Sequence, residues 1–95
     1  MGMSYYVTRV ELHYATYQDY ESLHAAMQRV GFSRFIVGDA GETYHLPTAE
    51  YVIVGDYDIA AVRNAAAKAA ETTGKRFAIV VTKGANVSWQ GLAAA

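Results

Sequence analysis

The chain has 95 residues, of which 53% are hydrophobic and 18% are charged, and its formal net charge is −1. This length suits one small domain with a single core. The absence of cysteine excludes disulfides, thiolate catalysis and cysteine-ligated zinc, and the near-zero charge predicts no general attraction to nucleic acid.

No run of the sequence approaches the ~20 apolar residues that a membrane-spanning helix needs. The N-terminus lacks the basic region and apolar core of a signal peptide. We therefore predict a single cytoplasmic domain over residues 1–95, with residues 86–95 as a tail and no membrane partner.

The first predicted strand covers residues 4–13, because its side chains alternate between two faces. One face consists of Tyr6, Thr8, Val10 and Leu12, and the other of Tyr5, Val7, Arg9, Glu11 and His13. The second face ends in three charged or titratable side chains that point the same way. This end of the strand is the leading candidate for a functional site.

The first predicted helix begins after Thr16, a favourable N-cap with Asp19 three residues later. An apolar stripe follows at helical spacing, formed by Tyr20, Leu23, Met27 and Val30. Gly31 is placed to end the helix in a left-handed conformation. Residues 32–37 then form a second strand, which the turn residues 38–41 close.

Residues 42–48 fit either a short hairpin arm or an irregular connection, and Pro47 argues against a central strand there. Residues 49–54 are a continuous β-prone run, interpreted as a central strand that ends at Gly55. Asp56 or Asp58 caps a second, alanine-rich helix from about residue 59 to residue 72. The last predicted strand covers residues 75–83.

The order strand, helix, strand, strand, helix, strand predicts an α+β fold of the ferredoxin-like split βαβ (βαββαβ) type. Two right-handed crossovers would place both helices on one face of a four-stranded antiparallel sheet. The other face stays open. The eight tyrosines of the chain suit such a face at an interface, so we expect a homodimer.

Glu11 and His13 are the candidate catalytic residues, because a carboxylate beside an imidazole can transfer protons while Arg9 holds phosphate. RNA hydrolysis through the 2′-hydroxyl needs such a set. The alternative is simple charge pairing across an exposed sheet. His24 is interpreted as a half-buried structural histidine, and His45 lies in a loop.

The three histidines show no metal-ligand spacing, so no cofactor is predicted. A divalent metal on Glu11 with Asp39 or Asp56 has no support in the spacing. Trp89, in the tail, has two interpretations: it adds to the sheet of a partner, or it packs on its own core.

From Phe32-Ser33 and Ile36 onward the chain resembles the GhoS antitoxin family, small bacterial endoribonucleases of type V toxin–antitoxin systems. The similarity continues through residues 46–47, the strand residues 50–52 and the helix after Gly55. The resemblance implies a ferredoxin-like homodimer, related to the CRISPR-associated dimeric nucleases, that cleaves the messenger RNA of a toxin. Those nucleases use a metal-binding aspartate at the end of the first strand, where this chain has His13 and Tyr14.

Under this resemblance Arg29 and Arg34 are RNA-binding residues; the alternative for each is a solvated surface arginine. We therefore predict an antitoxin-like RNA-binding protein or endoribonuclease acting on mRNA, with Glu11 and His13 as proton carriers. Two other functions stay open: a non-catalytic dimerisation module, and a small-molecule sensor domain with its pocket in the sheet face or dimer cleft.

Overall fold

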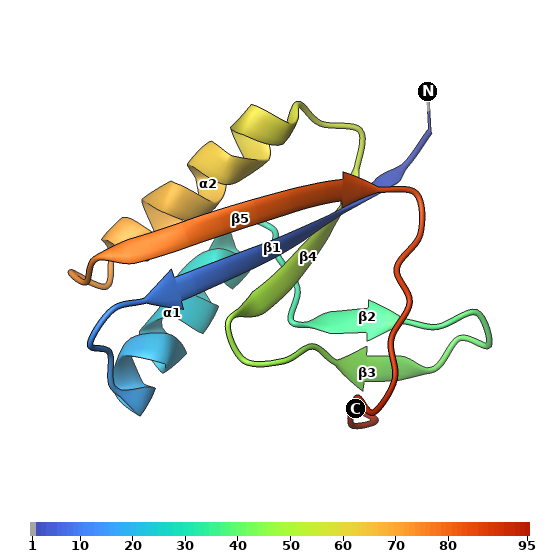
Figure 1. Ribbon diagram of the computed structural model, residues 1–95, viewed down its shortest axis with the longest axis horizontal. Coiled ribbons are helices and arrows are strands. Elements are labelled where there is room, and N and C mark those ends of the chain that lie inside the picture. The colour runs from blue at the N-terminus through green and yellow to red at the C-terminus, as the bar shows by residue number, and fades with distance from the viewer. Residues whose placement is uncertain (1) are drawn as a thin grey trace.

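The computed structural model describes residues 2–95, in which two helices pack against antiparallel strands (Figure 1). The elements are β1 (Ser4–Leu12), α1 (Tyr17–Arg29), β2 (Phe35–Val37), β3 (Thr43–His45), β4 (Glu50–Gly55), α2 (Ile59–Glu71) and β5 (Phe77–Gly84). The predicted α+β class is confirmed. The second strand is shorter than predicted. Residues 43–45 form a hairpin arm, which is one of the two alternatives that the sequence left open.

The strands form two sheets, so the predicted single sheet of four strands is wrong. β1 lies in the middle of a three-stranded sheet of order β4-β1-β5, and β2 pairs with β3 in a separate hairpin. One antiparallel bridge, between Ser33 and Val52, links the segment before β2 to β4. β4, predicted as a central strand, is therefore an edge strand of the three-stranded sheet.

Local hydrogen bonds and apolar packing explain why β2 leaves β4. The Ser33 hydroxyl accepts a hydrogen bond from the N–H of Phe35 (3.0 Å) and donates one to its carbonyl (3.2 Å), which turns the chain just after the bridge. Ile36 and Leu46 then bury their side chains against Val52. The hairpin thus covers this apolar surface instead of extending the ladder along β4.

The main core lies between the three-stranded sheet and both helices. Tyr6 and Val10 on β1 are fully buried there, as are Leu23 of α1 and Ala66 of α2. Because both helices contribute to the same cluster, they cover the same face of the sheet. The many alanines of α2 let this helix approach the strands closely.

The opposite face of the sheet is covered at one end by the chain itself. The β2–β3 hairpin and the tail form a second cluster around Tyr5 and Val7, with the Trp89 ring centroid 5.7 Å from that of Tyr44. In Figure 1 the tail runs from the end of β5 down to the hairpin, where Ala93 and Ala95 bond to β3. Trp89 thus packs on its own chain.

Candidate functional site

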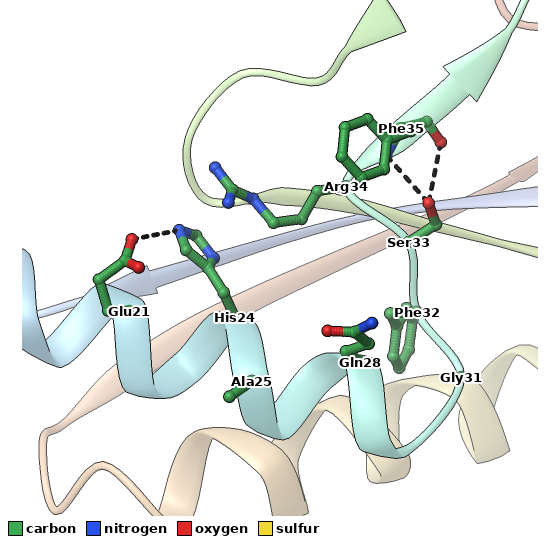
Figure 2. Close-up of a pocket in the computed structure, with 9 residues that line it drawn as sticks. All are labelled: Glu21, His24, Ala25, Gln28, Gly31, Phe32, Ser33, Arg34 and Phe35. Atoms are coloured by element: carbon green, nitrogen blue, oxygen red, sulfur yellow. Dashed lines mark hydrogen bonds and ion pairs between the residues drawn. The ribbon is translucent and has the colours of Figure 1, made fainter. Parts of the chain in front are cut away.

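A groove of about 600 Å³ opens between α1 and the segment that leads into β2 (Figure 2). One face of α1 contributes Glu21, His24 and Gln28, which recur at helical spacing. The segment of residues 31–35 forms the other wall. Gly31 has a φ of 101°, the left-handed conformation that ends α1 and directs this wall back along the helix.

His24 lies on the α1 wall of this groove with 9% of its surface exposed. Its Nδ1 atom is 2.6 Å from the hydroxyl of Tyr51, a β4 residue that is completely buried. The tyrosine hydroxyl has no other hydrogen-bond partner within residues 2–95, and an unsatisfied buried donor costs about 1–3 kcal/mol. We therefore assign Tyr51 as the donor to Nδ1, which leaves the imidazole hydrogen on Nε2.

Both members of this pair are uncharged at neutral pH. Burial lowers the pKa of His24, the Arg34 guanidinium lowers it further, and Glu21 opposes the change. Burial likewise raises the pKa of Tyr51, against the opposing effect of Arg34. His24 Nε2 lies 4.0 Å from the Glu21 carboxylate, which is too far for a hydrogen bond.

Arg34 extends across the groove towards His24 (Figure 2). Its Nε atom is buried and has no hydrogen-bond partner among residues 2–95. Within the described chain Arg34 forms no ion pair, whereas Arg9 contacts two carboxylates. A guanidinium has five N–H donors and no acceptor, so Arg34 keeps donors available for a ligand.

The groove therefore presents the Nε2–H of His24 and the guanidinium of Arg34 from opposite walls. Both groups donate hydrogen bonds, and Arg34 adds a positive charge. Glu21, which is half-exposed at one end of the groove, carries a negative charge that opposes the positive charge of Arg34. This arrangement suits the oxygens of a phosphate or carboxylate.

The side chains of the predicted site at the end of β1 are arranged differently from those of the groove. The guanidinium nitrogens of Arg9 lie 3.6 Å from a carboxylate oxygen of Glu11 and 3.7 Å from one of Glu50. Arg9 therefore takes part in charge pairing on the exposed face. No hydrogen bond or ion pair joins the side chains of Glu11 and His13 in the part of the chain that is described. Surface ion pairs of this kind contribute about 0–1 kcal/mol.

Of the predicted site residues only Arg34 lines the groove, and Arg29 lies in the last turn of α1. Sequence reasoning missed His24 and Tyr51 as a pair, because they lie on different elements. The polar positions 21, 24 and 28, spaced along one helix face, were the available signal. His45 packs on Phe35, with ring centroids 4.9 Å apart.

In residues 2–95 no three histidine or acidic side chains gather closely enough to hold a metal ion. Neither helix of that region has the length and apolarity to cross a bilayer.

The chain matches no protein-family model, no curated protein and no solved structure. The similarity to the GhoS antitoxin family therefore stays a prediction.

Proposed function

We propose that this protein binds RNA and holds one phosphate group in the groove between Arg34 and His24. The main support is the Arg34 guanidinium, which faces the groove with a buried, unpartnered Nε and no paired carboxylate within residues 2–95. With a net charge of −1, long-range attraction contributes little, so affinity has to come from this local contact.

Aromatic rings beside the groove favour RNA over a free phosphate ion. Phe35 lines the groove, is 43% exposed and lies against His45. Single-stranded RNA is recognised largely by stacking of unpaired bases on such rings, at about 1–3 kcal/mol per base. A nucleotide whose phosphate meets Arg34 would place its base near Phe35.

The proposed architecture is a ferredoxin-like split βαβ fold whose second strand has moved off the sheet. Two features support it: the order β4-β1-β5 with both helices on one face, and the Ser33–Val52 bridge on the side of β4 where a fourth strand would pair. In this proposal the hairpin is displaced to cover Tyr5 and Val7.

RNA cleavage is a further proposal that RNA binding does not require. Glu11 lies at the end of β1 beside Arg9, and His13 follows directly in the turn after Leu12, the last residue of the strand. Incubation of an RNA panel with and without EDTA tests this step, with Glu11→Gln and His13→Gln as variants. RNA that stays intact with the wild-type protein would rule out nuclease activity and leave the binding proposal unaffected.

The binding proposal is tested by fluorescence anisotropy with labelled single-stranded RNAs at several salt concentrations. We expect Arg34→Met to weaken binding about tenfold and to reduce the salt slope by about 1. Arg63→Met is the matched control, because it removes the same charge from the exposed face of α2. Equal affinities for the two variants, or no RNA binding by the wild-type protein, would contradict the proposal.

A further inference from the structure

The outer edge of β5 pairs with no other strand of residues 2–95. The N–H of His13 bonds to the carbonyl of Arg76, so in this register the even-numbered residues of β5 direct their backbone groups towards β1. The odd-numbered residues therefore direct theirs outward. The residues whose backbone N–H and C=O groups point away from β1 are Phe77, Ile79, Val81 and Lys83.

This edge lacks the features that usually prevent strands from pairing between molecules. Protected edges are short, or they contain proline, bulges or charged side chains. β5 has 8 residues, no proline and a single charge at Lys83. The Lys83 ammonium is itself held over the Tyr6 ring, 5.8 Å from the ring centroid.

The core is also incomplete along the same edge. Phe77, Ile79 and Val81 are on the helix side of β5 and contact the main cluster, but each is only half-buried. Their partners on the neighbouring strand β1 are all buried: Leu12, Val10 and Thr8. A strand added beside β5 would remove this remaining apolar surface from water.

We propose that β5 pairs antiparallel with β5 of a second copy of this chain, around a twofold axis at Val80. In this register Phe77 lies opposite Lys83 and Ile79 lies opposite Val81. Each outward-facing N–H and C=O then has a partner. The two three-stranded sheets become one continuous sheet.

Self-complementarity identifies the second copy, rather than another peptide, as the occupant. A twofold interface pairs residues at equal distances from its axis. Around Val80 these pairs join apolar or small residues: Ile79 with Val81, and Ala78 with Thr82. The two Lys83 residues fall at opposite ends, so no like charges meet, and Val80 itself is 62% exposed and free to meet its own copy.

The test uses Val80→Lys and Val80→Glu, with molar mass measured by size-exclusion chromatography and light scattering. We expect a wild-type dimer, and monomers for each variant, because facing like charges weaken association by at least about a hundredfold. An equimolar mixture of the two variants should form dimers again, since opposite charges then meet at the axis. Val37→Lys, which alters an exposed valine on β2, is the matched control and should stay dimeric.

Amide exchange by NMR supplies the second measurement on the wild-type protein. The N–H groups of Ile79 and Val81 should be protected only in the dimer, and those of Val80 and Thr82 in both states. The proposal would be overturned if the wild-type protein stayed monomeric at millimolar concentration. This holds also if a different peptide were found paired with the β5 edge of that monomer. So would a dimer that persists in Val80→Lys, or a mixture of the charged variants that stays monomeric.

Discussion

Burial of His24 has two consequences for the groove. It removes the imidazole from water, so the neutral form dominates. It also brings Nδ1 to the hydroxyl of Tyr51, and this contact determines which nitrogen keeps the hydrogen. A helix residue next to Leu23 has thereby become a donor that faces Arg34 across an open groove.

The lowered pKa of His24 predicts how stability changes with pH. Below the usual pKa of 6.5 the unfolded chain binds a proton at this residue more readily than the folded chain does. The contribution of His24 is therefore complete above that pH and is lost as the pH falls towards the lower, folded value. Urea unfolding at pH 7 and pH 5 should show a larger loss for the wild-type protein than for His24→Gln. Equal losses would contradict this assignment.

Removal of the Tyr51 hydroxyl should destabilise the fold. In Tyr51→Phe the buried Nδ1 of His24 loses the hydroxyl that donates to it, which costs about 1–2 kcal/mol of unfolding free energy. The control is Tyr14→Phe, because the Tyr14 side chain is almost fully exposed and should leave stability unchanged. Chemical denaturation measures both, and equal stabilities would show that the hydroxyl contributes nothing.

At the scale of elements, the start of α1 is set by a capping box. The Thr16 hydroxyl accepts a hydrogen bond from the N–H of Asp19 (3.2 Å), and the Asp19 carboxylate accepts one from the N–H of Thr16 (2.9 Å). These bonds lower the pKa of Asp19, with a smaller contribution from Lys75. With the exception of Lys75, all these groups belong to residues 16–19. The sequence was therefore enough to predict where this helix begins.

Thr16→Ala removes one side of the capping box and should cost about 1 kcal/mol of unfolding free energy. Thr16→Ser keeps the hydroxyl and should restore most of the loss. Thermal or urea unfolding of the two variants provides the comparison. A full loss in the serine variant would mean that the methyl group, and not the hydrogen bond, is responsible.

The connection from β4 to α2 leaves no room for a side chain at Gly55. A Cβ atom there would overlap the Tyr57 ring. The Tyr57 ring would have to leave its packing on the Tyr6 ring, where the two centroids are 5.8 Å apart. Gly55→Ala should destabilise by about 1–3 kcal/mol. Gly84→Ala, with ordinary contact distances, is the control, and equal stabilities would show that Tyr57 yields without penalty.

At the scale of the whole molecule, the protein has two apolar clusters on opposite faces of one sheet. The helices cover the first cluster, and the β2–β3 hairpin with the tail covers the second. The tyrosine-rich face that was expected to meet a second subunit is thus partly occupied by the chain's own Trp89. This leaves the edge of β5, and not the sheet face, as the proposed surface for dimer formation.

Trp89 should contribute substantially to the second cluster. We expect Trp89→Ala to lower the free energy of unfolding by about 2 kcal/mol, less than for a fully buried tryptophan because its ring is half-buried. Ser88→Ala, at an exposed neighbouring position, is the control. Urea unfolding monitored by circular dichroism is suitable, since it does not depend on the deleted fluorophore. Equal stabilities would show that the tail is not held by this residue.

Both helices, the long strand β1 and the α+β class could be predicted from the sequence alone. Their signals are local: caps, the 3.6-residue and two-residue periods, and glycines such as Gly31. The position of β2 depends on long-range packing, because its few residues bury Ile36 in the second cluster instead of pairing with β4. Tertiary packing also brought His24 of α1 to Arg34 across the groove and to the buried Tyr51 of β4 behind it, and no local pattern reports such distances between separate elements.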